Sequence, residues 1–274
     1  MKATVIFSTY NSEEWLEKVI IGFSVQTEQD FEIVIADDGS TDKTKELIDR
    51  LRIETAIPIK HVWQEDHGFQ KTKILNKAIL AAASDYLIFT DGDCIPRNDF
   101  VDVHLNYREI GYFLSGGYFK LPMNVSKLIT KDDIISQRCF QLKWLKSHGL
   151  AKSIKNSKLI ARGFWTKILN KATPTSPSWN GHNASGWKKD LLEINGFNQE
   201  MQYGGEDREL GERLFNLGIK SKQIRYSAIC VHLDHARGYV NQEAIDKNRA
   251  IRDYTLKNKV IKTPNGINLN AVEE

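Results

Sequence analysis

Strand-like and helix-like patterns alternate through the first 93 residues, and this alternation restricts the fold more than any other feature of the sequence. Short apolar runs predict strands at residues 4–7, 31–40 (ending in acids and a turn), 59–63 and 86–90. Between them, apolar residues at helical spacing predict helices over 12–23, 41–51 and 68–83. This order indicates βαβ units, so we expect an α/β fold with a mainly parallel sheet.

Polar clusters follow three of these strands where each strand ends, at residues 8–11, 37–40 and 91–93. In open α/β sheets the ligand binds outside the carboxyl ends of the strands. We therefore expect the three clusters to meet at one edge of the sheet. No GxGxxG sequence follows the first strand, which argues against a dinucleotide-binding Rossmann domain.

Two carboxylates, Asp91 and Asp93, stand one residue apart at the end of the strand YLIFT. Residues two apart on an extended stretch point to the same side, so the two charges repel unless a cation or a substrate offsets them. Hard divalent cations take oxygen ligands and share them with phosphate. The pair predicts a metal site, and an ordinary Asp-Gly turn is the alternative.

Residues of the other clusters suit a nucleotide. The carboxylate of Asp38 can accept hydrogen bonds from a uracil imide or from ribose hydroxyls, and Tyr10 can stack on a base. Gly68 allows close approach of the backbone, and Lys71 and Lys73 carry charge that can reach phosphate. Each also has an ordinary structural interpretation, as a solvated turn, a packing aromatic residue or a lysine on an exposed helix face.

Residues 120–171 form a basic segment that the formal net charge of +3 conceals, with 12 Lys or Arg against only two acidic residues. Aromatic residues such as Phe164 and Trp165 interleave with its lysines. This mixture predicts either a weak contact with an anionic membrane or a solvated helical cover over the active site. We expect no nucleic-acid partner, since no known binding module is visible.

Cysteine use and apolar content predict a cytoplasmic protein. The three cysteines lack CxxC spacing, which indicates free thiols in a reducing compartment. The apolar start is too short for a signal peptide, and no run approaches the ~20 residues that span a bilayer. If the basic segment binds lipid, we expect a peripheral position on the inner face of the cytoplasmic membrane.

Several motifs, in this order, resemble those of a known family. STYN, ADDGSTD, EDHGFQKTKILNKAI and FTDGDCIPR are similar to the nucleotide-binding half of family 2 glycosyltransferases with the GT-A fold. GHNASGWKKDLLEINGFNQE (181–200) resembles the family's GxNxS stretch, and YGGEDRELGERL (203–214) resembles the acceptor motif of galactosyltransferase-like segments, also seen in chondroitin polymerase. VHLDHAR (231–237) resembles the histidine motif that follows. The resemblance covers residues 3–240, apart from 122–172.

The resemblance implies a metal-dependent transferase that uses a nucleotide-sugar donor. Asp93 is then the ligand of Mn²⁺ or Mg²⁺, with Asp91 a weaker ligand that also meets the ribose. His232 or His235 completes the metal shell, and we prefer His232. The implied nucleotide-sugar-binding residues are Thr9, Tyr10, Asn11, Asp38, Gly68, Lys73, Asp91 and Gly92.

The acceptor side is implied by Glu206 and Asp207, which open a predicted helix after two glycines. We expect Asp207 to take a proton from the acceptor hydroxyl in an inverting transfer, and Glu206 to bind that hydroxyl. Gly205 and Asn183 are the further acceptor contacts. Lysines at 73 and 188 stand where the family often has Arg, Trp187 replaces a usual Phe, and Arg208 replaces a third acid, which leaves the acceptor open.

The expected organisation is a nucleotide-sugar-binding half (1–121), a basic aromatic helical insertion (122–172), an acceptor and catalytic segment of the same domain (173–256) and a loosely packed tail (257–274). We expect an inverting transfer from a UDP-sugar to a glycan or lipid-linked glycan, in bacterial surface polysaccharide or lipopolysaccharide synthesis. Two alternatives remain: a nucleotidyltransferase, which would need a Gly-rich loop after the first strand, and a non-catalytic glycan- or membrane-binding protein on a degenerate transferase fold.

Overall fold

The computed structural model describes residues 1–235 and 241–267, and its first half follows the predicted alternation of strands and helices. The predicted strands are β1 (Ala3–Thr9), β2 (Phe31–Asp37), β3 (Ile59–Trp63) and β4 (Tyr86–Asp91). The helices between them are α1 (Glu13–Ser24), α2 (Asp42–Thr55) and α3 (Lys71–Ala81). The expected α/β class with a mainly parallel sheet is therefore confirmed.

Two sheets organise the chain. The larger has seven strands in the order β3-β2-β1-β4-β8-β6-β9, and β3, β2, β1 and β4 are parallel. Strand β8 (Ala184–Trp187) runs antiparallel to both β4 and β6 (Tyr112–Ser115), and β9 (Lys220–Gln223) runs parallel to β6. The smaller sheet has the order β5 (Cys94–Pro96), β10 (Ile229–His232) and β7 (Gly117–Lys120).

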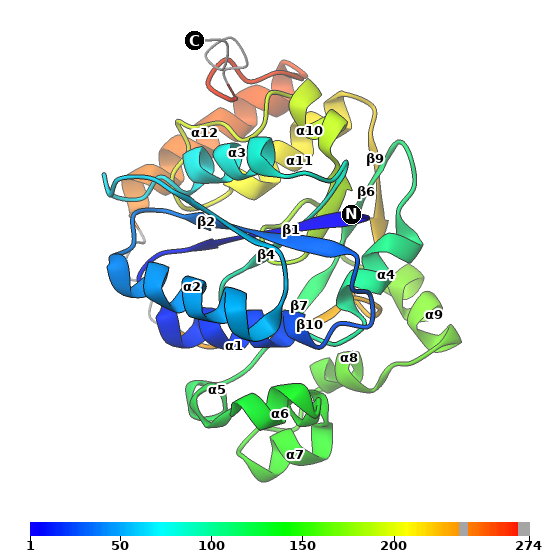
Figure 1. The fold of residues 1–274 in the computed structure, drawn as a ribbon. Helices are drawn as coiled ribbons and strands as arrows, with labels where there is room; N and C mark the ends of the chain where they lie inside the picture. The colour runs from blue at the N-terminus through cyan, green and yellow to red at the C-terminus, as the bar shows by residue number, and fades with distance from the viewer. Residues whose placement is uncertain (236–240, 268–274) are drawn as a thin grey trace.

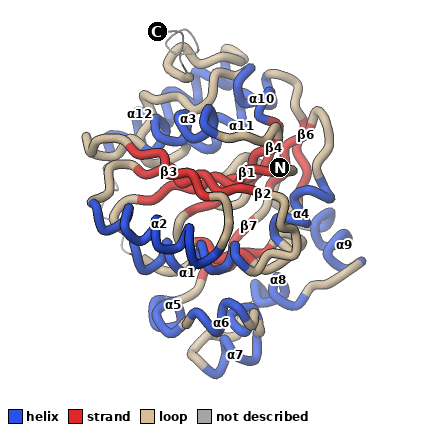
Figure 2. Tube along the Cα trace, in the orientation of Figure 1, coloured by secondary structure: helices blue, strands red, loops and turns tan. Residues whose placement is uncertain are grey.

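Helices cover both faces of the larger sheet (Figures 1 and 2). On one face lie α1 and α2, and on the other lie α3, α10 (Lys188–Glu193), α11 (Glu206–Asn216) and α12 (Gln242–Lys257). Side chains of a strand alternate between faces, so in β1 Val5 and Phe7 join the core beneath α1, and Ile6 joins the core beneath α3. Burial on both faces explains the continuous apolar runs that predicted these strands.

The remaining helices lie outside these layers. Helix α4 (Phe100–Tyr107) follows β5, and the segment 122–172 forms short helices as predicted. They are α5 (Met123–Leu128), α6 (Lys131–Ile135), η1 (Arg138–Phe140), α7 (Leu142–Ser147), η2 (Ile154–Asn156), α8 (Ser157–Ile160) and α9 (Phe164–Ala172). In Figure 1, α5, α6 and α7 lie below α1, on the side away from the larger sheet. Within the described ranges, no helix is both long and apolar enough to cross a membrane.

Two sequence-based expectations need correction. Helix α3 begins at Lys71 instead of Gly68, because the backbone N–H of Gln70 donates to Asp38 Oδ2 at 2.8 Å and Gly68 has a φ of +79°. The tail from residue 257 is mostly exposed, as expected, but its last described residue is not loosely packed: Ile267 is buried in the core beneath α3, and its N–H donates to the Asn195 carbonyl. Residues 268–274 lie outside the described ranges.

A buried polar network joins the two sheets through Asn183, which precedes β8. Its side-chain amide donates to the carbonyls of Gly117 and Ala228, both at 3.0 Å, and its Oδ1 lies 3.0 Å from His104 Nε2. Burial lowers the pKa of His104 to about 3, so the ring is neutral, and Nε2 must carry the proton that Asn183 accepts. The expectation that Asn183 binds the acceptor is therefore wrong: the residue is fully buried, and every polar atom of its side chain is used inside the protein.

We expect Asn183→Ala to lower the free energy of unfolding by about 3 kcal/mol, because it removes the interior partner of His104 Nε2 and of two carbonyls. Urea denaturation measures this change. The exposed residue Asn106, whose amide bonds only to Asp102 on its own helix, provides the matched control Asn106→Ala with little effect. Unchanged stability of Asn183→Ala, together with weaker acceptor binding, would restore the sequence-based assignment.

Candidate active site

A cavity of about 770 Å³ opens at the carboxyl edge of the parallel strands. Its walls come from the ends of β1 and β4, the loop before α3, the first turn of α11 and the end of β10. The predicted residues that line it are Thr9, Tyr10, Asn11, Asp38, Gly68, Asp91, Gly92, Asp93, Glu206, Asp207 and His232. Residues more than 200 positions apart in the sequence thus meet at the edge of the sheet, as the position of the polar clusters predicted.

Asp91, at the end of β4, is paired with a lysine. Lys71 Nζ lies 3.1 Å from Asp91 Oδ1, and both side chains are largely buried. Burial opposes the charge of both groups, but the Lys71 ammonium outweighs it and holds the pKa of Asp91 below its ordinary value. In the same way, Asp91, Asp207 and Glu206 outweigh the burial of Lys71 and raise its pKa well above the usual range. The cavity therefore contains a fixed positive charge beside three carboxylates.

Asp93 lies between two histidines. Its Oδ2 is 2.9 Å from His235 Nε2 and 3.5 Å from His232 Nε2. The antiparallel register of β10 on β5 pairs His232 with Cys94, which places the imidazole beside the preceding Asp93. Both histidines that the sequence offered as metal ligands are therefore within reach of the same carboxylate.

The residues around Asp93 fit a divalent cation. Oxygen and imidazole nitrogen atoms from Asp93, His232 and His235 converge there, with Asp91 two residues away. Among the described residues, the buried Nδ1 atom of His232 has no hydrogen-bond partner, so this nitrogen is left unsatisfied while Nε2 lies beside Asp93. Cys94 Sγ lies within 4.8 Å of the Asp93 and His232 donor atoms, but burial raises its thiol pKa well above the ordinary value, which disfavours the thiolate that metals bind.

Glu206 and Asp207 form the first turn of α11, opposite the strand ends. Glu206 is buried, and its Oε2 accepts from the N–H of Gly204 at 2.9 Å. Burial and the neighbouring Glu206 carboxylate raise the pKa of Asp207 to about 7. In the described part of the chain, Asp207 Oδ1 is buried without a hydrogen-bond partner, although Asp207 borders the cavity. A carboxylate with this pKa and an unused oxygen is suited to accept a proton near neutral pH.

The side of the cavity near β1 and β2 combines an aromatic ring with a buried carboxylate. Tyr10 is half exposed at the cavity wall, and its hydroxyl donates to Asp66 Oδ2 at 2.9 Å, which fixes the ring. Asp38 is buried and accepts from Gln64 Nε2 at 2.7 Å and from Gln70 N–H, although burial still raises its pKa. A Cβ on Gly92 would lie 2.7 Å from the Ser8 carbonyl, so this turn between the aspartates requires glycine.

Two predicted residues do not line the cavity. Lys73 lies two residues beyond Lys71 on α3, about 200° around the helix, so Lys71 faces the cavity in its place. Gly205 has a φ of +102° and borders a second cavity on the other side of its loop. The sequence offered both Lys71 and Lys73 as lysines that could reach phosphate. Only the residue at which α3 begins determines which of them faces the cavity.

Several residues that line the cavity were not predicted from the sequence, among them Trp15, Tyr118, His182 and Tyr203. His182 stacks edge-on against Tyr118, and burial lowers its pKa to about 4, so its ring is neutral. It precedes β8, whose antiparallel direction places its start at the carboxyl end of β4. His182 belongs to the motif GHNAS, which the sequence shows. Its position at the cavity could be predicted only if the strand that follows it were known to run antiparallel to β4.

Comparison with known proteins agrees with this geometry. The family model described as glycosyl transferase family 2 matches residues 4–120, and the model described as the N-terminal domain of galactosyltransferase matches residues 171–236. The gap between the two matches, residues 121–170, covers all but the last two residues of the helical segment 122–172.

Curated relatives include validoxylamine A glucosyltransferase of Streptomyces hygroscopicus subsp. limoneus, which is 27% identical over 82% of this chain and 50% of its own length. Chondroitin synthase of Escherichia coli is 25% identical over 81% of this chain and 33% of its own length. The chain thus spans about half the length, or less, of these two relatives.

Solved structures share the fold. The mannosyltransferase PcManGT of Pyrobaculum calidifontis, in complex with GDP-Man and Mn²⁺, has a TM-score of 0.59 and 20% identity over 87% of this chain and 58% of its own. GalNAc-T7 with UDP, GalNAc and Mn²⁺ has a TM-score of 0.61 and 14% identity over 91% of this chain and 47% of its own. The fold is that of the GT-A glycosyltransferases.

The two family matches lie in the order of the motifs found in the sequence, and the carboxylates of both halves line one cavity. Residues 4–120 therefore form a glycosyl transferase family 2 segment, and residues 171–236 form a galactosyltransferase-like C-terminal segment.

Proposed function

We propose that this glycosyltransferase is metal-dependent and inverting, and that it transfers a sugar from a UDP-sugar to a hydroxyl of a glycan acceptor. The observation that carries the proposal is the single cavity in which the Asp93–histidine cluster faces Asp207. Asp93 and Asp207 come from different halves of the chain and line different walls, so the cavity has one side for a diphosphate and another for a nucleophile. The Mn²⁺ complexes of the structural neighbours support a divalent cation.

On the donor side, Asp93, His232 or His235, and Asp91 are the residues that would hold Mn²⁺ or Mg²⁺. Bound there, the cation would act as a Lewis acid that stabilises negative charge on the leaving diphosphate. Tyr10 and Asp38 bind the base and ribose, with Thr9, Asn11, Gly68 and Gly92 forming the surrounding wall. Lys71 adds a positive charge to the same side of the cavity.

On the acceptor side, Asp207 is the base and Glu206 positions the acceptor hydroxyl. The hydroxyl proton passes to Asp207 as the acceptor oxygen bonds to the anomeric carbon. The bond from that carbon to the diphosphate breaks on the opposite face, and its electron pair leaves with the diphosphate. A pKa of about 7 suits this role, because the base must be ionised before the reaction and must hold the proton after it.

We expect Asp93→Asn and Asp207→Asn to lower transfer by at least about a hundredfold, for different reasons. Asp93→Asn removes a charged ligand, so it should also abolish the metal-dependent part of UDP binding. Asp207→Asn removes only the base, so it should leave UDP binding intact. Calorimetric titration of UDP with Mn²⁺ or with a chelator, beside a transfer assay over a panel of UDP-sugars, separates the two losses.

Asp102 on α4 provides the control, because its carboxylate bonds only to Asn106 and lies outside the cavity. Asp102→Asn should retain both binding and transfer. Full activity of Asp207→Asn would overturn the assignment of the base. UDP binding that ignores the metal would overturn the metal site and favour the alternative of a non-catalytic binding protein.

The raised pKa of Asp207 also predicts a pH-dependent cost in stability. The pKa of Asp207 is about 7 in the folded state, against ~3.9 for an unfolded Asp, so the folded state favours the protonated carboxyl. The stability that this preference contributes is complete below about pH 3.9 and is lost as the pH rises through about 7. Asp207→Asn has no such loss. Thermal unfolding should therefore show an advantage of the variant that grows between pH 4 and pH 7 and levels off above. An advantage independent of pH would contradict the raised pKa.

We also propose that the acceptor is a glycan or lipid-linked glycan of a bacterial surface polysaccharide or lipopolysaccharide, and that the helical segment holds the enzyme at the inner face of the cytoplasmic membrane. Large apolar side chains are exposed on this segment, with Phe164 at 73% and Trp165 at 67%. Lys167 and Lys171 follow on the same helix, α9. Exposed aromatic rings beside basic groups match the chemistry of an anionic lipid surface.

The double substitution Phe164→Glu and Trp165→Glu should abolish sedimentation with vesicles of phosphatidylcholine and phosphatidylglycerol, because it removes apolar area and adds repulsive charge. Ile53→Glu on α2 is the matched control, since Ile53 is 84% exposed on a different surface. Sedimentation should be weak with phosphatidylcholine alone. Equal sedimentation of all three proteins would leave the helices as a solvated cover of the active site.

A further inference from the structure

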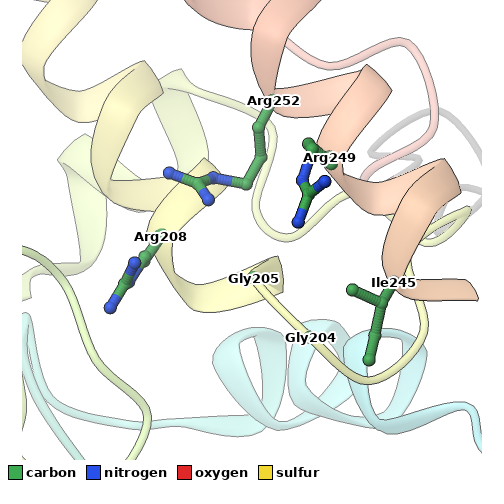
Figure 3. Close-up of a pocket in the computed structure, with 6 residues that line it drawn as sticks. All are labelled: Gly204, Gly205, Arg208, Ile245, Arg249 and Arg252. Atoms are coloured by element: carbon green, nitrogen blue, oxygen red, sulfur yellow. The ribbon is translucent and has the colours of Figure 1, made fainter. Parts of the chain in front are cut away.

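A second cavity, of about 330 Å³, lies behind the loop that leads to the proposed base. It is lined by Gly204 and Gly205, by Arg208 on α11, and by Ile245, Arg249 and Arg252 on α12. Figure 3 shows Arg249 and Arg252 extending from α12 toward the start of α11, with Arg208 on α11. The next residues along the chain on either side of the two glycines, Tyr203 and Glu206, line the catalytic cavity. The two cavities therefore share one loop as their common wall.

The charge of this cavity is positive and only partly neutralised. Arg252 pairs with Glu212 across the helix interface. Arg208 and Arg249 are exposed, and within the described residues neither makes an ion pair with a carboxylate. On α12, Ile245, Arg249 and Arg252 are spaced by four and three residues, so they share one face of the helix. Guanidinium groups gathered without acidic partners are suited to bind an oxyanion by paired hydrogen bonds.

The walls of the cavity are held in place. Asn248 on α12 is buried, and its amide donates to the carbonyls of Gln202 at 2.9 Å and Gly204 at 3.2 Å, which ties the loop to the helix. Thr255 donates to Glu209 at 3.0 Å, which ties α12 to α11. The arginines therefore extend from a fixed backbone, and part of the entropic cost of forming the site is already met by folding.

The two glycines keep this cavity open. Their φ angles are +111° and +102°, which favour glycine. A Cβ on Gly204 would lie 3.0 Å from Ile245 Cγ1, and a Cβ on Gly205 would lie 3.1 Å from Arg252 Cδ. Any side chain at either position would therefore point toward residues that line the cavity.

We propose that this arginine cavity binds an anionic group of the acceptor, a carboxylate or a phosphate, beside the hydroxyl that is glycosylated. The inference rests on the proposed function, since it assigns this side of Asp207 to the acceptor. An acceptor whose hydroxyl reaches Asp207 extends past the Gly204–Gly205 loop, where nothing larger than a hydrogen atom projects from the backbone. The anion then contacts Arg208 and Arg249, and Arg252 remains paired with Glu212.

The test measures the binding of three small probes by ligand-observed NMR: glucuronate, glucose 6-phosphate and neutral glucose. We expect the two anionic sugars to bind more tightly than glucose, and binding to weaken as salt is raised. The double substitution Arg208→Ala and Arg249→Ala should weaken the anionic probes by about tenfold or more. Lys247→Ala is the matched control, because Lys247 is an exposed cation on α12 that does not line the cavity.

Titration of UDP with Mn²⁺ onto the same proteins separates this inference from the proposed function. UDP binding that persists in the arginine variant shows that the donor site is intact, whereas absence of UDP binding in every protein counts against the proposed function alone. A preference for glucuronate or for glucose 6-phosphate identifies the anion. The inference is overturned if glucose binds as well as the anionic sugars, if the arginine variant binds them unchanged, or if UDP displaces them.

Discussion

The antiparallel pairing of β10 with β5 is the contact on which the rest of the site depends. It joins residue 232 to the turn that follows β4, so two segments about 140 positions apart supply one cluster of carboxylate and imidazole groups. The smaller sheet that contains this pair is held against the larger one by Asn183, through two carbonyls and the His104 ring. A buried amide that makes no contact with substrate thus fixes the distance between the two halves of the site.

The electrostatics of the cavity follow from crowding acids at the edge of the sheet. Asp91, Asp207 and Glu206 lie close enough together to affect one ammonium group, Lys71, and that charge compensates only part of their repulsion. Burial and the Glu206 carboxylate together raise the pKa of Asp207. Under the proposed function, a cation on one side of the cavity and proton transfer on the other would relieve this repulsion.

The alternation of strands and helices could be predicted from the sequence because each pattern is local. In β1 and β2 the apolar runs reflect burial on both faces, and the polar residues at their ends mark the edge of the sheet without any knowledge of the partner strands. The burial of Ile267 could not be predicted for a related reason: the few apolar residues after 257 show no periodicity, and Ile267 is held in the core beside Asn195 of a distant segment. Periodicity cannot reveal a contact made by one side chain.

The sequence alone determined the chemistry of the site, since Asp91, Asp93, Glu206, Asp207 and the histidines stand in motifs that can be read without coordinates. Only the tertiary structure decided which other residues lie beside these groups at the cavity. In the structure Lys71, and not Lys73, faces the cavity, because α3 begins at Lys71. Asn183 is buried away from the acceptor side, and Gly205 borders a second cavity that is lined by arginines. The physical reason is that a residue's type limits what it can bind, whereas its direction and its partners are set by packing between segments far apart in the chain.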